Sequence, residues 1–119
     1  MKGISMKSYY NYLIKKSRAT LFKLTSLRGE NADLKAEKLL KTCSIEVVET
    51  VSIILILGRD AYYDKQTEPV KDPVKLFKEY YDEHWIDDPE MKEYEIEYIV
   101  SKRDLPDYLQ AGMKALNIQ

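Results

Sequence analysis

Residues 44–57 read SIEVVETVSIILIL, an apolar stretch that is followed by Gly58. Its β-branched residues favour a strand, but the run is longer than a usual strand and no second convincing strand could pair with it. On a helical wheel Glu46, Glu49 and Thr50 share one side, while the second half is apolar all round, which is typical of a buried helix. We therefore expect a helix over residues 44–57 at the centre of the fold, ended by Gly58.

Two further helices are predicted before this stretch. Residues 5–28 contain no Pro or Gly and are followed by Gly29, and their apolar residues repeat at helical spacing. This pattern predicts an amphipathic first helix that ends at the glycine. Asn31 or Asp33 can then cap a short second helix that runs to Leu40.

The second half of the chain carries three more helix starts. Residues 59–71 are expected to be irregular, and Asp72-Pro73 and Asp88-Pro89 each look like a cap followed by proline at the first helical position. Residues 94–98 alternate in a way that also fits an edge strand, although we predict a helix. Asp104, three residues before a second Asp, resembles a capping box. The chain is therefore predicted to be one all-α domain over residues 1–119, a compact bundle of about five or six helices around a central apolar helix.

Composition excludes several classes of protein. Of the 119 residues 45% are hydrophobic and 33% are charged, with only four Gly and four Pro, which argues against disordered and low-complexity chains. The longest strongly apolar run, residues 51–57, is too short to span a bilayer, and no signal core follows the start. Cys43 is the single cysteine and fits a reducing compartment. We expect a cytoplasmic protein with no membrane partner.

Charge is segregated along the chain. Residues 1–29 hold seven basic residues and no acidic one, whereas the remainder holds 12 basic and 20 acidic residues. From Glu79 to Glu97 there are nine acidic residues and one basic residue, Lys92. Such segregation can provide a surface for nucleic acid, a surface for a basic partner, or two segments of one fold that attract each other. All three remain open from the sequence.

Nucleic-acid binding is one interpretation of the basic first helix. Cations that neutralise phosphates and rings that stack on bases are combined in six candidate residues: Lys15, Arg18, Lys23, Arg28, Tyr12 and Phe22. In the competing interpretation the two rings pack against a neighbouring helix or a second subunit while the lysines stay in water. Basicity of a single face without a recognised binding fold favours the competing interpretation.

The tyrosine content favours a protein partner. There are ten tyrosines, including three adjacent pairs, and adjacent residues on a helix point about 100° apart, so some of these rings must reach the surface. Exposed aromatic rings are enriched at protein interfaces, although tyrosine also fills core rims with its hydroxyl in water. The leading expectation is a small non-catalytic interaction or regulatory module that self-associates. A homodimer in which the basic first helix meets the acidic segment of the other copy fits these charges.

Residues for catalysis or metal binding are scarce. Cys43 and His84 are the only thiol and imidazole, and nothing in their spacing brings them together. Cys43 is expected to be a small buried residue beside a helix start. His84 with Asp87, Asp88 and Glu90 is the best metal-like cluster, yet Asp88 is already explained as a cap. No catalytic residue, cofactor or metal ligand is therefore assigned, and a metal or enzymatic site near His84 remains a third possibility.

Two short segments resemble a known family. Leu55-Ile56-Leu57-Gly58-Arg59 and the closing Leu105-Pro106-Asp107-Tyr108-Leu109-Gln110-Ala111-Gly112 are similar to motifs of the bacterial family catalogued as domain of unknown function 3775. The opening residues 12–19 are similar to its first helix, whereas Asp60 stands where the family has a second glycine. The resemblance implies an all-helical bacterial protein and implies no activity.

Overall fold

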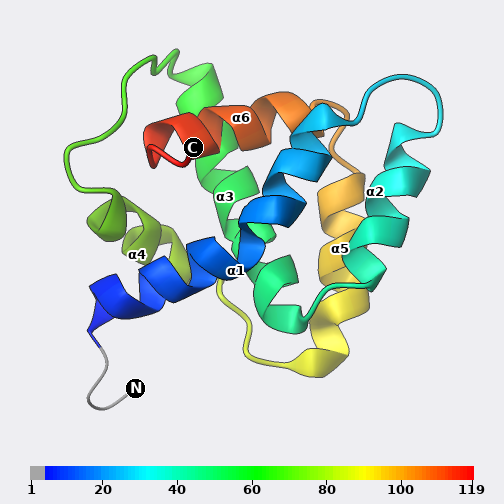
Figure 1. Cartoon of the computed structure of the whole chain (residues 1–119), viewed down its shortest axis with the longest axis horizontal. Coiled ribbons are helices and arrows are strands. Elements are labelled where there is room, and N and C mark those ends of the chain that lie inside the picture. The colour runs from blue at the N-terminus through cyan, green and yellow to red at the C-terminus, as the bar shows by residue number, and fades with distance from the viewer. Residues whose placement is uncertain (1–4) are drawn as a thin grey trace.

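Six α-helices and one short 3-10 helix make up residues 5–119, the part of the chain that the computed structural model describes (Figure 1). Their bounds are α1 Met6–Ser26, α2 Ala32–Lys41, α3 Ile45–Tyr63, α4 Pro73–His84, η1 Pro89–Met91, α5 Lys92–Val100 and α6 Leu105–Ala115. No strand occurs within residues 5–119, so the predicted all-α bundle is confirmed. None of the helices in this part of the chain is long and apolar enough to cross a bilayer.

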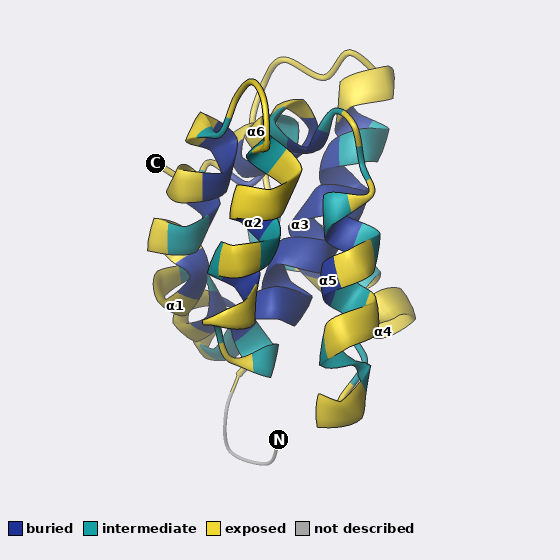
Figure 2. Cartoon of the chain, turned by 90° about the vertical axis from the view of Figure 1, so that its right-hand side faces the viewer, coloured by how far each residue is buried: buried dark blue, intermediate teal, exposed yellow. Residues whose placement is uncertain are grey.

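Helix α3 lies at the centre, as predicted. Every residue from Val47 to Gly58 is buried, and α1, α4, α5 and α6 all pack against this helix. Figure 2 shows α3 as buried along most of its length, while the surrounding helices are exposed on their outer sides. The continuous apolar character of the stretch therefore reflects contact with other helices on every side.

The end of α3 differs from the prediction. The helix continues through Gly58 to Tyr63, because Gly58 serves a crossing of two helices and does not cap one. A Cβ atom at Gly58 would lie 1.9 Å from the Tyr108 carbonyl oxygen of α6, and one at Gly112 would lie 2.5 Å from the Ile54 carbonyl oxygen. The missing side chains thus let the backbones of α3 and α6 touch, which outweighs the helix-weakening effect of glycine.

The true end of α3 has no glycine. Lys65 takes the left-handed conformation with φ 55°, and the Gln66 N–H donates to the Ala61 carbonyl at 3.0 Å, as in a Schellman motif. The irregular connection is consequently shorter than predicted and spans residues 64–72. It is held to α6 by the Val70 N–H, which donates to the Ala115 carbonyl at 2.9 Å.

The first two helices follow their signals only in part. α1 ends at Ser26, so Arg28 lies beyond the helix, where it donates to the Thr25 and Leu27 carbonyls at 2.9 Å each. It still complements the carbonyl end of the helix, as its charge predicts. Asn31 is the N-cap residue of α2, but it is left-handed and makes no side-chain cap bond, so the predicted capping chemistry is wrong there.

The later helix starts confirm both Asp-Pro signals. Asp72 accepts from the Lys75 N–H at 3.1 Å and starts α4, and Asp88 accepts from the Glu90 N–H at 3.0 Å and starts η1, which leads into α5. Residues 94–98 are helical, and the edge-strand alternative is wrong. Asp104 precedes α6 without a side-chain cap bond, so no capping box forms.

Candidate interaction surface

The outer side of α1 presents the basic residues that the sequence indicated. Lys15, Arg18 and Lys23 are exposed, and none of them forms an ion pair with any residue in the described part of the chain. Phe22 is exposed among them at 42%, and the Arg18 guanidinium lies 5.8 Å from the centre of its ring. We call Lys15, Arg18, Phe22 and Lys23 the basic face. It combines unpaired cations with one accessible aromatic ring.

The other two candidate residues do not belong to this surface. Tyr12 donates its hydroxyl proton to Glu46 at 3.1 Å, and the Lys16 ammonium lies 2.8 Å from the same carboxylate. The hydrogen bond from Lys16 lowers the pKa of Glu46, and the same bond raises the pKa of Lys16. Tyr12 is therefore engaged in holding α1 on α3. Arg28 lies 3.9 Å from Asp107 of α6, past the end of the helix.

A groove runs between α1 and α6 beside the basic face. It has a volume of about 430 Å³ and is lined by Phe22, Thr25, Gln110, Met113, Lys114, Ile118 and Gln119. No acidic residue lines it, and Phe22, Met113 and Ile118 supply its apolar surface. We call it the α1–α6 groove. Gln110 and Lys114 also line a second hollow of about 310 Å³ that reaches Tyr62, so the outer side of α6 has accessible depressions on both flanks.

The prediction that some tyrosines reach the surface is confirmed. Tyr12, Tyr62, Tyr63 and Tyr94 are all large exposed residues. Most of them are engaged with neighbours, since the Tyr63 hydroxyl lies 2.8 Å from that of Tyr108 and the Tyr62 ring lies edge-on to Tyr108 at 5.3 Å. Surface tyrosines in this chain thus fall into a bonded group and one exception, Tyr94.

The acidic segment does not neutralise the basic face within the chain. Among the described residues, the carboxylates between Glu79 and Glu97 form ion pairs only with Lys78 and His84 of α4 itself. α1 meets α4 through aromatic rings, with Tyr9 at 5.8 Å from Tyr81 and 6.4 Å from Trp85. The interpretation in which the two charged segments pair within one fold is therefore not realised as ion pairs.

The metal-like cluster is not assembled. His84 lies 3.7 Å from Glu83, and Asp88 is occupied as the cap of η1. Across residues 5–119 there is no group of three or more His, Cys, Asp or Glu side chains placed to hold a metal ion. Cys43 is half-buried rather than buried, with its thiol 3.4 Å from the Leu39 carbonyl.

Glu49 is a titratable residue whose burial was not predicted from the sequence. The wheel placed it on the polar side of α3, but it is only 1% exposed, and its Oε1 accepts from the Ile86 N–H at 3.1 Å. Burial, and next the nearby Glu95 carboxylate, raise the pKa of Glu49 to about 8. On the same side of α3, Ser52 lies one turn and Ile56 two turns after Glu49, and these residues are small and apolar, respectively. This pattern in the sequence indicates that other helices cover the side of α3 that carries Glu49.

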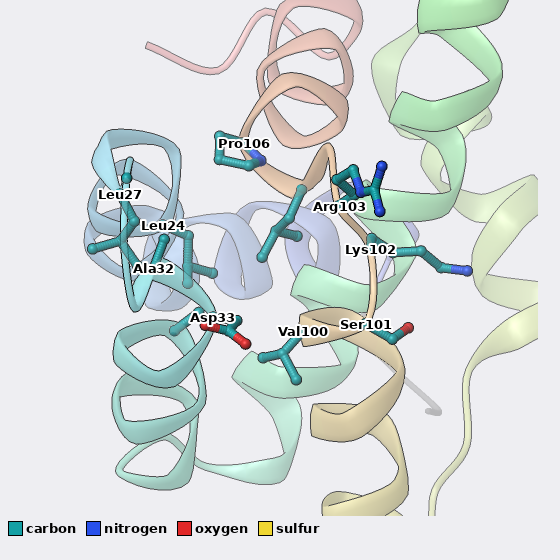
Figure 3. Close-up of a pocket in the computed structure, with 12 residues that line it drawn as sticks. Leu24, Leu27, Ala32, Asp33, Val100, Ser101, Lys102, Arg103 and Pro106 are labelled. Carbon is teal, nitrogen blue, oxygen red and sulfur yellow. The ribbon is translucent and has the colours of Figure 1, made fainter.

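A third hollow lies where α1 ends, between α2 and the connection from α5 to α6 (Figure 3). It measures about 350 Å³, and its lining combines apolar side chains, Leu24, Leu27, Ala36, Val100 and Leu105 among them, with the charged residues Asp33, Lys102 and Arg103. Figure 3 shows Lys102 extending away from the hollow, and its ammonium lies 4.4 Å above the Tyr98 ring.

Comparison with known proteins adds no relative. No family model matches the chain, and neither the curated proteins nor the solved structures gave a match. The resemblance to domain of unknown function 3775 thus stays a prediction. The function has to be argued from the surfaces described above.

Proposed function

We propose that this chain is a small, non-catalytic helical interaction module that self-associates, in keeping with a regulatory role. The single observation that carries the proposal is the pair of oppositely charged surfaces that form no ion pairs within residues 5–119. The basic face of α1 has no ion pair among the described residues, and neither do Glu90, Glu93 and Glu97 around α5. Complementary potentials on one molecule favour association between copies.

Both surfaces carry exposed charges that have no ion-pair partner in the described part of the chain. Unpaired exposed charges are well solvated and cost little in a monomer, so their separation by sign is not required for folding. An exposed aromatic ring beside them is the residue type that interfaces use most. Two such surfaces on one chain let a second copy supply the opposite charge to each.

Light scattering over a range of protein concentrations tests this proposal. We expect the mass to rise above the 14.0 kDa of one chain as concentration increases, and to fall back in high salt because the attraction is screened. The Lys15→Glu, Arg18→Glu variant should lose this rise. A matched control is Lys35→Glu, Lys38→Glu, which makes the same charge change at exposed positions of α2. A mass of one chain at every concentration would overturn the proposal.

Nucleic-acid binding is the second candidate, and one observation favours it. Arg18 lies over the accessible Phe22 ring, next to Lys15 and Lys23, so that phosphate neutralisation and base stacking could occur together. Retardation of DNA or RNA in a gel should weaken steeply with salt and disappear in the Lys15→Glu, Arg18→Glu variant. Retardation that is unchanged in this variant would remove the candidate.

A further inference from the structure

Tyr94 stands out among the exposed aromatic residues. It is 67% exposed, the highest value among the large hydrophobic residues described as exposed. Its ring contacts no other aromatic ring and its hydroxyl makes no hydrogen bond within residues 5–119, unlike Tyr12, Tyr62 and Tyr63. A tyrosine in this setting leaves a large apolar ring in water with no compensating contact.

The surroundings of Tyr94 are acidic. Glu90, Glu93 and Glu97 are exposed and lie on the same side of η1 and α5 as Tyr94, opposite the buried Ile96 and Ile99. We call Glu90, Glu93, Tyr94 and Glu97 the acidic face. It places an exposed aromatic ring among carboxylates that form no ion pair within residues 5–119.

The α1–α6 groove has the complementary properties. Its surface offers Phe22, Met113 and Ile118 for contact with a ring, and Thr25 and Gln110 offer polar groups for a hydroxyl. Lys114 lines the groove, and Arg18 lies over Phe22 at its side, so the charges around it are basic. A ring bordered by carboxylates matches an apolar groove bordered by cations, because the apolar surfaces can pack together and the surrounding charges are opposite in sign.

The two surfaces cannot meet within one chain. α5 packs on α2 and α3, while the C-terminal end of α6 lies on the other side of α1 (Figure 1). An occupant of the groove that carries the acidic face therefore has to be another molecule, and a second copy of this chain carries it by definition.

We infer that Tyr94 of one copy inserts into the α1–α6 groove of a second copy, with the glutamates beside it facing Arg18 and Lys114. This inference rests on the proposed self-association and assigns the two surfaces that contact each other. Although the anchor and the groove are different surfaces, two such contacts related by a two-fold axis would together form one isologous interface and close a dimer.

The test compares matched tyrosine variants by light scattering. Tyr94→Ala should weaken association about tenfold or more, because a buried aromatic anchor carries much of the binding energy of an interface. Tyr63→Ala is the control, since Tyr63 is 66% exposed but lies at the end of α3, away from the acidic face. If the wild type associates and Tyr94→Ala associates equally well, this inference fails while the proposed function stands. If the wild type never exceeds one chain, both fail.

A mixing experiment tests the pairing itself. Tyr94→Ala lacks the anchor and keeps the groove, whereas Phe22→Ala lacks part of the groove and keeps the anchor. Each variant alone should associate much more weakly than the wild type and show little energy transfer between fluorescently labelled copies, whereas a mixture of the two should show more, because one intact contact can form between them. Lys114→Glu, at an exposed position, is a second groove variant that should behave like Phe22→Ala.

The remaining outcomes are decisive too. Circular dichroism should show an unchanged helical content for each variant, since all three altered side chains are exposed. Association that depends on Phe22 and Lys114 but not on Tyr94 would mean that another segment fills the groove, and it would overturn the inference. Loss of DNA retardation in the groove variants without any change in mass would assign the groove to nucleic acid instead.

Discussion

The crossing of α3 and α6 and the outer faces of α1 and α5 use opposite means of contact. At the crossing two backbones touch, and a Cβ at Gly58 would meet the Tyr108 carbonyl at 1.9 Å. On the outer faces the charged side chains of the basic face and of Glu90, Glu93 and Glu97 are exposed and form no ion pairs within the described residues. The difference shows two uses of the helix surface: α3 and α6 pack closely because glycine lacks a side chain, whereas the exposed charges of α1 and α5 are the surfaces on which the proposed association depends.

Gly58→Ala is the strongest challenge to this comparison. The added methyl cannot be relieved by a rotamer change, because the atoms it meets belong to the backbone of α6. We expect a loss of about 4 kcal/mol or more in the free energy of unfolding, which places it among the exceptional single substitutions. Urea denaturation followed by circular dichroism gives the value.

Gly29→Ala is the control that measures the cost of replacing a glycine that no other backbone approaches. Gly29 has φ +82° and nothing lies within 4 Å of where its Cβ would be, so only the left-handed backbone is strained. That strain costs about 1–2 kcal/mol. If Gly58→Ala loses no more unfolding free energy than this control, the two helices separate easily. The close contact of their backbones would then not distinguish the crossing from the outer faces.

The misplaced end of α3 shows what a single sequence contains about such a crossing. The periodicity and length of residues 44–57 are local properties, and they were sufficient to predict a central helix. The role of Gly58 depends on Gly112, which lies 54 positions further along the chain. No local pattern distinguishes a glycine that ends a helix from one that another backbone approaches.

Glu49→Gln tests whether the buried carboxyl of Glu49 on α3 destabilises the fold when it loses its proton. The pKa of Glu49 is raised to about 8 in the folded protein, against about 4.3 in an unfolded chain. Between these values the folded state holds one proton more than the unfolded state, so stability falls as pH rises. The contribution is complete below the unfolded pKa and is lost as pH rises through about 8.

The variant should therefore be more stable than the wild type above the folded pKa, by up to about 5 kcal/mol, and should differ little at the unfolded pKa and below. Glutamine keeps an oxygen for the Ile86 N–H and carries no charge to face Glu95, the one carboxylate that acts on Glu49. Unfolding curves recorded across this pH range measure the difference. A difference that is constant with pH would show that Glu49 does not titrate there.

Helix starts away from the centre give a smaller, local effect. Asp72 accepts from the Lys75 N–H at 3.1 Å, whereas Asp104 makes no side-chain cap bond. Asp72→Ala should cost about 1 kcal/mol of unfolding free energy, and Asp104→Ala should cost clearly less. Thermal unfolding of both variants checks the pair, and equal losses would contradict the geometry.

These two aspartates also show how far the sequence predicts local chemistry. Both precede a helix with proline in its first turn, and both were expected to cap. At Asp72 the backbone allows the bond to form. At Asp104, which follows α5 after a three-residue connection, the backbone takes a different conformation, φ −99° and ψ 31°. Cap identity is visible in the sequence, but the backbone conformation of the cap residue is not.

The candidate surface was predicted less well than the fold, because it too depends on contacts between segments that are distant in the sequence. Helical spacing correctly grouped Lys15, Arg18, Phe22 and Lys23 on the outer side of α1. It could not show that Tyr12 is bonded to Glu46, or that α6 supplies the other wall of a groove beside Phe22. Which faces are paired is a property of tertiary packing, so only the structure separates Tyr94 from the other exposed tyrosines.

The smallest expected effect is the one that completes the comparison. Lys15→Glu, Arg18→Glu should change the free energy of unfolding by no more than about 0.5 kcal/mol, because neither side chain forms an ion pair within residues 5–119 and Arg18 loses only its exposed contact with the Phe22 ring. Lys16→Ala, which removes the bond to Glu46 at 2.8 Å, is the control on the same helix and should cost somewhat more. Urea denaturation under conditions where the protein is a single chain measures both. If reversing the two charges destabilises the monomer by more than the control does, the basic face contributes to folding, and its lack of partners could no longer be used to argue for association.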